Sequence, residues 1–424
     1  MIKVFENPGA AEWSELARRP HIDLTSMLDT VKEVFDAVRS SGDDALRQYT
    51  LKYDNVSIDS IAVPDDEIEA AGQYIPDGLK HDIETAIGSL RAMSKAQYQP
   101  RVEVEPFDGV RCWYDYKPID KVGLYVPAGS APLFSSVLML AVPASVAGCP
   151  EKILCAPPDK DGRINPAILY AAGQSGVNKI FRIGGIQAIA AMTLGTESVP
   201  QVYKICGPGN RYVTAAKQFA TFFGTAIDMP AGPSELMIVA DGEADPSLVA
   251  IDFLSQLEHG PDSQSLLVTT SKTLIEDFFK WVDEQIVMLS RREIVKRGLS
   301  NCRIIYMEDM QQVIDFANFY APEHIIFHTE NCREHAEAIR NAGSVFVGGR
   351  SSVSAGDYIS GSNHVLPTGG YAKGFSGLNL QTYMHGVYYQ AIDNSGVIEL
   401  AGHIYSMAHF EGLDGHSMAF TSRL

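Results

Sequence analysis

The stretch Val202-Tyr203-Lys204-Ile205-Cys206-Gly207-Pro208-Gly209-Asn210 decides the fold. Its first half is a short apolar strand, its second half is a glycine-containing turn, and a helical run, 211–222, begins directly after it. A strand that passes through a turn into a helix is half of a βαβ unit, which builds parallel sheets. A phosphate or dinucleotide can bind at such a helix N-terminus. The full G-x-G-x-x-G pattern is absent because its sixth position is Tyr212, so the turn alone is more typical of an ordinary strand–helix connection.

The same alternation of strand and helix extends in both directions from this stretch. Between 122 and 228 the expected strands are Val122–Val126, Lys152–Ala156, Lys179–Ile183, Val202–Cys206 and Thr225–Asp228. A second series follows, with strands expected at Leu236–Ala240, Ser265–Thr269, Arg303–Tyr306, His324–Phe327 and Ser344–Val347. We therefore predict an α/β fold with two doubly wound, Rossmann-like units. A cleft between them would bind ligands at the carboxyl ends of the strands.

The remaining segments complete the expected domain division. Residues 1–22 are expected to form a short N-terminal arm, and residues 125–235 the second α/β domain. The larger α/β domain would combine residues 23–124, which contain two helical runs, with residues 236–377. Residues 378–424 return to helical spacing and are predicted to form a C-terminal arm. This arm is too short to be a stable domain alone, so it should dock on another surface.

The overall composition excludes several classes of protein. The 424 residues are 46% hydrophobic and 20% charged, which is typical of a globular protein with two or three cores. The net charge of −18 argues against nucleic acid as a partner, because phosphate backbones bind to basic surfaces. No apolar run approaches the roughly 20 residues that span a membrane, and we expect no membrane association. The N-terminus lacks a signal pattern, and the six cysteines form no CxxC pair, so a cytoplasmic protein with reduced thiols is expected.

A second stretch, Ser255–Asp262, ends an apolar helical run and carries a candidate metal site. Gln256 and His259 are three residues apart, so they share one face of the last helical turn. A carboxamide oxygen and an imidazole placed together can form half of a metal site. The alternative is a polar helix end at which His259 only caps carbonyl groups, and this stretch alone favours that alternative.

Glycine-containing turns also follow two further strands of the second unit. Tyr125 begins the turn 125–129, and Gln187 ends the turn 184–187. Together with the turn before Asn210, they place three such turns at one edge of the sheet, which favours a nucleotide site. The alternative for Tyr125 and Gln187 is the ordinary polarity of loops.

Two polar segments could bind a substrate or transfer protons. Ser234 lies where the chain is expected to cross the cleft, although a hinge turn explains it equally well. Glu323 and His324 open a strand, and a carboxylate beside an imidazole can act as general acid and base. Side chains alternate along a strand, so the two would point to opposite faces. A surface glutamate beside a half-buried histidine is therefore the simpler alternative.

The segment 354–368 is the most unusual loop in the sequence, because it is long and rich in groups that bind ligands. Long irregular segments inside a compact protein are usually functional. Asp357 could give an oxygen ligand to a metal held by His259, and His364 lies in the same loop. Near the C-terminus, Glu411 and His416 have no link in spacing to these residues.

Taken together, these stretches resemble the histidinol dehydrogenase family over essentially the whole chain. The resemblance rests on motifs that occur in the family's order and at compatible spacings: Tyr125–Ser130, Gly207–Asn210, Asp228–Glu235, Gln256–Gln264, Pro322–His324 and Ala355–Thr368. It implies oxidation of L-histidinol to L-histidine through an aldehyde, with zinc and two NAD⁺, as the last step of histidine biosynthesis.

The resemblance also implies roles for individual residues, by their match to the family's motifs. The implied zinc ligands are Gln256, His259, Asp357 and His416, which also bind the substrate. The implied acid–base pair is Glu323, which activates water, and His324, the general base. Further substrate contacts would come from Ser234, Glu323, His364 and Glu411, and NAD contacts from Tyr125, Gln187 and Asn210. In the family the last histidine comes from the partner subunit, which implies a homodimer with shared active sites.

Two other classes of function remain open from the residues themselves. A zinc hydrolase could use Gln256, His259 and Asp357 with Glu323 as base, but it would have no use for the glycine turns near 184 and 207. A non-catalytic binder with two closing α/β units is the other alternative, and most such proteins carry the secretion signal that this N-terminus lacks.

Overall fold

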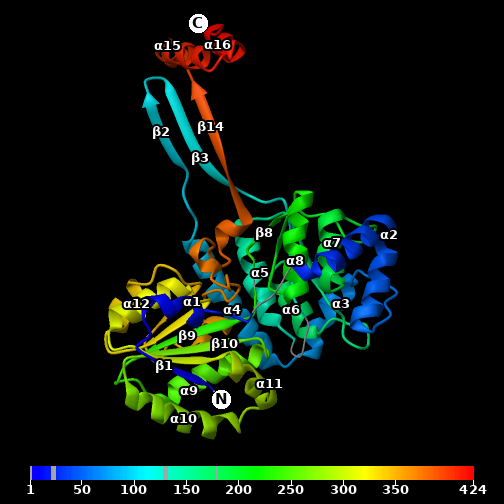
Figure 1. The fold of residues 1–424 in the computed structure, drawn as a ribbon. Coiled ribbons are helices and arrows are strands. Elements are labelled where there is room, and N and C mark those ends of the chain that lie inside the picture. The colour runs from blue at the N-terminus through cyan, green and yellow to red at the C-terminus, as the bar shows by residue number, and fades with distance from the viewer. Residues whose placement is uncertain (1, 21–24, 128–131, 178, 231) are drawn as a thin grey trace.

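The computed structural model describes residues 2–20, 25–127, 132–177, 179–230 and 232–424. Two α/β units lie side by side, and a long arm that ends in the C-terminus projects away from them (Figure 1). The predicted class, with two doubly wound units, is confirmed by the two separate parallel sheets.

The first unit is built on a six-stranded parallel sheet. Its strands, from one edge to the other, are β1 (Lys3–Glu6), β11 (Arg303–Tyr306), β10 (Gln264–Thr269), β9 (Glu235–Ala240), β12 (His324–His328) and β13 (Ser344–Val347). The central strands β9 and β10 are buried along their whole length, as strands covered on both faces must be. β1 was not predicted as a strand, so the segment 1–22 is less separate than we expected.

Helices cover both faces of this sheet and form its two cores. On one face, Leu236 and Ile238 pack with residues of α9 (Pro246–Gln256), α10 (Lys272–Ile286) and α11 (Arg292–Gly298). On the other face, Met237 and Val239 pack with α1 (Trp13–Leu16), α12 (Met310–Tyr320) and α13 (Cys332–Glu337). The short α14 (Val353–Tyr358) follows β13. Alternate residues of β9 therefore serve opposite cores, as the pleat of a strand requires.

The second unit has a five-stranded parallel sheet with the same winding. Its order is β6 (Lys179–Arg182), β5 (Glu151–Ala156), β4 (Lys121–Tyr125), β7 (Lys204–Cys206) and β8 (Ala226–Ile227). In the second sheet the chain starts at the central strand β4, moves outward through β5 and β6, and then returns to β7 and β8. The first sheet winds in the same way from β9, with β1 added at its edge. The crevice beside such a starting strand is where doubly wound folds bind their ligands.

The helices between 28 and 96 pack on this second sheet, whereas we expected residues 23–124 to join the larger domain. α2 (Leu28–Asp54) shares a core with α7 (Gly185–Leu194) and α8 (Arg211–Ala220) on one face. α4 (Asp77–Ala96) shares the core of the other face with α5 (Phe134–Ala147) and α6 (Pro166–Gln174), and α3 (Asp65–Ala70) packs on α6. We assigned these helices to a domain by their order in the chain, but their packing is decided by their apolar faces.

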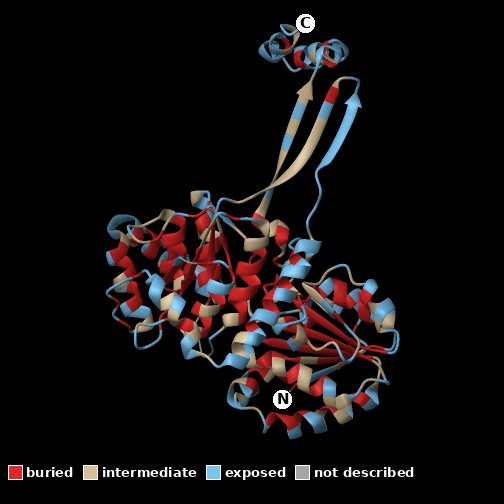
Figure 2. Ribbon diagram, turned by 180° about the vertical axis from the view of Figure 1, so that it is seen from behind, coloured by how far each residue is buried: buried red, intermediate tan, exposed pale blue. Residues whose placement is uncertain are grey.

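The arm is a three-stranded antiparallel sheet that ends in two helices. β14 (Met384–Ile392) pairs with β3 (Val110–Pro118), which pairs with β2 (Val102–Phe107). α15 (Asn394–Phe410) and α16 (Asp414–Thr421) pack on each other at its far end (Figure 1). The two helices were predicted, but β14 was not, since the start of this segment reads as helical spacing. Much of the arm is exposed (Figure 2).

Within the described residues, no helix combines the length and apolarity needed to cross a membrane.

Candidate active site

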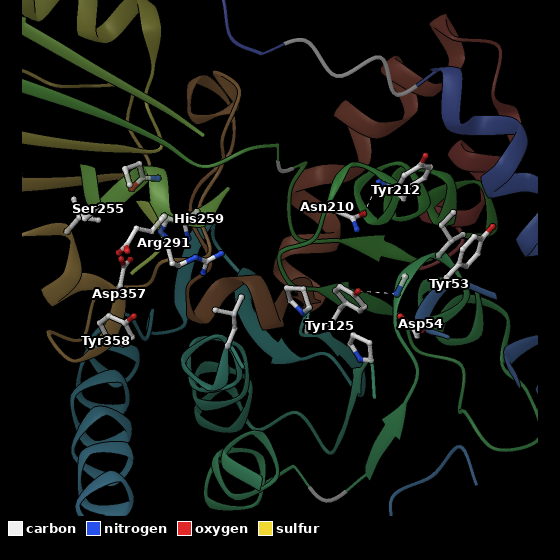
Figure 3. Close-up of a pocket in the computed structure, with 18 of the residues that line it drawn as sticks. Tyr53, Asp54, Tyr125, Asn210, Tyr212, Ser255, His259, Arg291, Asp357 and Tyr358 are labelled. Atoms are coloured by element: carbon white, nitrogen blue, oxygen red, sulfur yellow. Dashed lines mark hydrogen bonds between the residues drawn. The ribbon is translucent and has the colours of Figure 1, made fainter. Parts of the chain in front are cut away.

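A cavity of about 970 Å³ lies between the two α/β units (Figure 3). The second unit contributes Tyr125, Gln187 and Asn210 to its wall, and the first unit contributes residues from α9 and α14. Half of the predicted site residues line this one cavity: Tyr125, Gln187, Asn210, Gln256, His259 and Asp357. The expected cleft between the units is therefore present.

The two units present different edges of their sheets to ligands. In the second unit, Tyr125 ends β4 and Asn210 follows β7, so both lie at the carboxyl edge, as predicted. In the first unit, His259 precedes β10 and Glu323 precedes β12, so these residues lie at the amino edge. The predicted site residues His259 and Glu323 therefore do not lie at the carboxyl ends of the strands of the first unit.

The end of α9 positions the candidate metal ligands of the first unit. Asp245 caps the helix by accepting a hydrogen bond from the Ser247 N–H at 2.8 Å. After Gln256 the backbone tightens into a 3₁₀ turn, Leu257–His259, before Gly260. Three residues complete one 3₁₀ turn, so Gln256 and His259 stay on one side. The Nε2 atom of Gln256 is buried and has no hydrogen-bond partner among the described residues.

Three side chains with donor atoms that suit a metal line the cavity. Gln256, His259 and Asp357 line the same cavity and offer carboxamide, imidazole and carboxylate donors, which suit zinc. Among the described residues of the single chain, no group of three His, Cys, Asp or Glu residues is close enough to hold a metal. The donor types of the three side chains, and not a closed cluster, are what fits a zinc ion here.

Glu323 and His324 lie against each other at the start of β12. The Nδ1 atom of His324 is 3.6 Å from Oε2 of Glu323, and this same oxygen accepts a hydrogen bond from the Glu235 N–H at 2.8 Å. The expected alternation does not separate the two side chains, because Glu323 precedes the strand. Burial lowers the pKa of His324, but the Glu323 and Asp357 carboxylates outweigh it, and the pKa is raised. The two side chains therefore form an ion pair when His324 is protonated.

His364 faces the same charged groups from the loop after α14. Its Nδ1 atom lies 2.9 Å from the backbone oxygen of Asp357, and its Nε2 atom lies 3.1 Å from Oγ of Ser136. Burial lowers the pKa of His364, and the nearby His259 and His324 add to this, against the effect of Asp357. Sequence reasoning did not find Ser136. Its only signal was a hydroxyl pair, Ser135 and Ser136, at the start of the mostly apolar α5.

The turn between β7 and α8 is held by a buried ion pair. The carboxylate of Asp228 accepts a hydrogen bond from the Gly207 N–H at 2.7 Å, and Lys217 donates to the Gly207 carbonyl at 2.8 Å. Lys217 and Asp228 also contact each other, with side chains that are 4% and 0% exposed. Gly207 has φ +138°, and a Cβ there would lie 2.1 Å from the carbonyl oxygen of Tyr125. Only glycine fits this position.

The residues predicted to contact a dinucleotide surround this turn. Asn210 caps α8, since its Oδ1 accepts hydrogen bonds from the N–H groups of Tyr212 and Val213 at 3.0 and 3.2 Å. The Tyr125 hydroxyl accepts a hydrogen bond from the Gly185 N–H at 3.1 Å. Gln187 is fully buried, yet neither polar atom of its amide has a partner among the described residues. Buried amides are almost always paired, so this one indicates a missing polar ligand.

Ser234 lies beside a smaller hollow of about 520 Å³ rather than in the main cavity. Arg19 reaches this region and pairs with Glu235, while the Tyr320 hydroxyl donates to the same carboxylate at 2.9 Å. Because the Glu235 N–H binds Glu323, this network extends to the acid–base pair. Arg19 comes from the N-terminal segment, and no local pattern in the sequence pointed to it.

Glu411 and His416 are not brought to the cavity of their own chain. Glu411 is the C-cap of α15, His416 lies in α16, and both are exposed. These two helices form the far end of the arm, well away from both α/β units (Figure 1). Residues 128–130 of the predicted Tyr125–Ser130 motif, and residue 231 of the segment before Ser234, lie outside the described residues.

Comparison with known proteins places the chain in one family. A sequence model described as histidinol dehydrogenase matches residues 17–424. The histidinol dehydrogenase of Bacteroides thetaiotaomicron is 49% identical over 424 residues, which cover 100% of this chain and 99% of that protein. That of Escherichia coli K12 is 44% identical, with 98% and 95% covered.

A solved structure leads to the same family. The crystal structure of histidinol dehydrogenase from Elizabethkingia anophelis superposes with a TM-score of 0.96 at 43% identity, and the match covers 100% of this chain and 98% of that one. The chain is an oxidoreductase and belongs to the histidinol dehydrogenase family.

Proposed function

We propose that this protein carries out the four-electron oxidation of L-histidinol to L-histidine through the aldehyde, using zinc and two NAD⁺. The observation that carries the proposal is the single cavity that joins Gln256, His259 and Asp357 on one wall to Tyr125, Gln187 and Asn210 on the other. A hydrolase would need the first wall alone. A hydride transfer needs both, because the substrate carbon must meet a bound nicotinamide.

Zinc would be held by Gln256, His259 and Asp357, with His416 of the partner subunit as the further ligand. The chemistry that the metal supplies is orientation, since it can bind the imidazole and the amine of the substrate. Ser234, His364 and Glu411 would complete the contacts to histidinol. For His364, its hydrogen bond to the backbone of Asp357 fixes the ring beside a proposed ligand.

Proton transfers would be carried out by His324 and Glu323. In the first oxidation, hydride leaves the alcohol carbon while Nε2 or Nδ1 of His324 accepts the hydroxyl proton. In the second, Glu323 accepts a proton from the water that adds to the aldehyde, while His324 returns its proton to the aldehyde oxygen. A second hydride then leaves the resulting hydrate for NAD⁺, and His324 accepts the hydroxyl proton of the hydrate. The raised pKa of His324 suits a base that must hold a proton between steps. Their near-complete burial keeps bulk water from competing.

The NAD⁺ would lie against the carboxyl edge of the second unit. Both buried amide atoms of Gln187 lack partners within the described part of the chain, so they are available to bind the dinucleotide. Asn210 uses its Oδ1 to cap α8, so it would contact the cofactor through its amide N–H groups. The fixed turn at Gly207 lets the backbone approach the dinucleotide closely.

A homodimer with exchanged arms would complete each site. Large apolar side chains along the arm are exposed, including Tyr388 at 83% and Phe410 at 94%. Many exposed large apolar side chains on one projecting element are typical of an interface. An arm that docks on a second subunit would bury these side chains and bring the partner's His416 and the partner's Glu411 to the other cavity.

The reaction is tested by adding histidinol and NAD⁺ to the zinc-loaded protein and following the nicotinamide absorbance. Two NADH should form for each histidinol consumed, because the conversion of an alcohol to an acid releases four electrons. The matched variant His324→Asn should keep its zinc but lose most turnover. No NADH from the wild-type protein, or full activity in the variant, would contradict the proposal.

A further inference from the structure

The second unit lacks a carboxylate where dinucleotide-binding folds usually place one. In such folds an acidic residue about 20 residues after the glycine turn, at the end of the second strand, binds the adenosine ribose. Here the second strand, β5, is followed by Pro157, which lines the cavity and has no polar side chain. The nearby Asp159 accepts hydrogen bonds from the N–H groups of Asp161 and Arg163, so it caps its own turn.

A different carboxylate, Asp54, faces the same cavity. It is the last residue of α2, which ends there because Asn55 adopts a left-handed conformation with φ 56°. Its Oδ2 atom is buried and has no hydrogen-bond partner among the described residues. Burial raises the pKa of the Tyr125 phenol, and the Asp54 charge adds to this rise, which shows that the two groups are neighbours. Asp54 as a whole is half-buried, and a carboxylate with one buried, unpaired oxygen is costly unless a ligand provides a donor.

The position of Asp54 in the cavity determines which part of a dinucleotide it could bind. Asp54, Tyr53 and Tyr125 lie at one end of the cavity, whereas His259 and Asp357 lie at the other (Figure 3). The nicotinamide must lie at the second end, where the substrate is held. The adenosine half therefore reaches Asp54, and the exposed rings of Tyr53 and Tyr212 offer faces on which a base can stack.

We propose that Asp54 binds the hydroxyls of the adenosine ribose and thereby makes the enzyme prefer NAD⁺ to NADP⁺. This inference rests on the proposed function. A carboxylate accepts hydrogen bonds from both ribose hydroxyls, but it repels a 2′-phosphate in the same place. Among the described residues that line the cavity, Arg291 is the only lysine or arginine, and it lies at the metal end, beside His259 (Figure 3). Lys52 and Arg211 lie outside this lining, 5.2 and 5.5 Å from the ring centres of Tyr53 and Tyr212, so the predicted preference rests on the Asp54 carboxylate alone.

The variant Asp54→Asn tests this inference, with Asp36→Asn as its control. Asp36 lies on the same helix, is 57% exposed in its side chain, and pairs only with the exposed Arg39 among the described residues. Steady-state rates are measured with histidinol and either NAD⁺ or NADP⁺. Calorimetry measures the binding of ADP-ribose and of its 2′-phosphate.

The loss of a charged hydrogen-bond acceptor predicts a rise of about 10- to 100-fold in KM for NAD⁺ and in Kd for ADP-ribose. The kcat at saturating NAD⁺ should change by less than about 2-fold, since Asp54 lies away from the reacting carbon. The preference for NAD⁺ over NADP⁺ should fall by at least about 10-fold. Asp36→Asn should leave every value unchanged.

Three results would overturn the inference. One is an unchanged cofactor preference in folded Asp54→Asn protein while the wild type reduces NAD⁺ normally. That result would leave the proposed function intact. Another is an equal loss of affinity for ADP-ribose and its 2′-phosphate. If the wild type neither reduces NAD⁺ nor binds ADP-ribose, the proposed function and this inference both fail. If Asp54→Asn does not fold, Asp54→Ser is measured by the same criteria.

Discussion

The ion pair between Lys217 and Asp228 gives the sharpest prediction about stability. The substitution Lys217→Met removes the charge and keeps most of the length of the side chain, so it opens little space. Asp228 keeps its hydrogen bonds from the N–H groups of Gly207 and Met229, both at 2.7 Å, but it loses its cation. The Asp228 side chain is 0% exposed, so water cannot replace the missing charge.

The expected loss is about 3–5 kcal/mol in the free energy of unfolding, which is typical when one partner of a buried ion pair is removed. Urea denaturation of the variant and the wild type measures it. The control is Lys280→Met. Lys280 forms an ion pair with Asp277 at 2.7 Å, but the side chains are 70% and 50% exposed. That change should cost less than about 1 kcal/mol.

The double variant Lys217→Met/Asp228→Asn should recover part of the loss, because the uncompensated charge is then absent. Since the pair also holds Gly207, the single variant should raise KM for NAD⁺ as well. A loss below about 1 kcal/mol for Lys217→Met, equal to that of the surface control, would refute the view that this pair is desolvated.

Three further perturbations test other parts of the site. Gly207→Ala puts a Cβ 2.1 Å from the Tyr125 carbonyl oxygen at φ +138°. The free energy of unfolding, measured by urea denaturation, should fall by at least about 3 kcal/mol. Near-wild-type stability would contradict the geometry. Burial raises the pKa of Asp54 from 3.8 to about 6, so its ionisation destabilises the fold. The stability that this group contributes is present below the unfolded pKa and is lost as pH rises through about 6. After discounting for partial exposure, Asp54→Asn should be more stable than the wild type by about 1–2 kcal/mol at pH 8, but not at pH 4. Thermal unfolding at the two pH values measures the difference. Ser136→Ala removes the 3.1 Å contact to His364 and should raise KM for histidinol about 5-fold with unchanged KM for NAD⁺; equal changes in both constants would contradict a contact confined to the substrate side.

The strands of both sheets could be predicted because buried parallel strands are continuous apolar runs. The predicted run Leu236–Ala240 and the observed β9, Glu235–Ala240, differ by one residue. β1 and β14 could not be found in this way. β1 is only four residues long and mostly exposed, and β14 lies in the arm, with no fully buried residue. Without a buried face, a strand leaves no clear period in the sequence.

The candidate site was predictable where local spacing carries the chemistry and not where distant segments meet. Gln256 and His259 are three residues apart, and the helix end that joins them was visible in the sequence. Asp54 and Ser136 reach the site through the packing of α2 and α5, so no pattern in the adjacent sequence indicates their role. The placement of α2–α4 on the second sheet was missed for the same reason.

In the proposed homodimer, each active site is shared between two chains. The most direct test mixes two inactive variants, His259→Asn and His416→Asn, under conditions that exchange subunits, and measures NADH formation in isolated heterodimers. If the arm is exchanged, one of the two sites of each heterodimer has all its wild-type ligands, so about half of the wild-type activity should return. If His416 serves the cavity of its own chain, every site carries one substitution, and verified heterodimers would remain inactive.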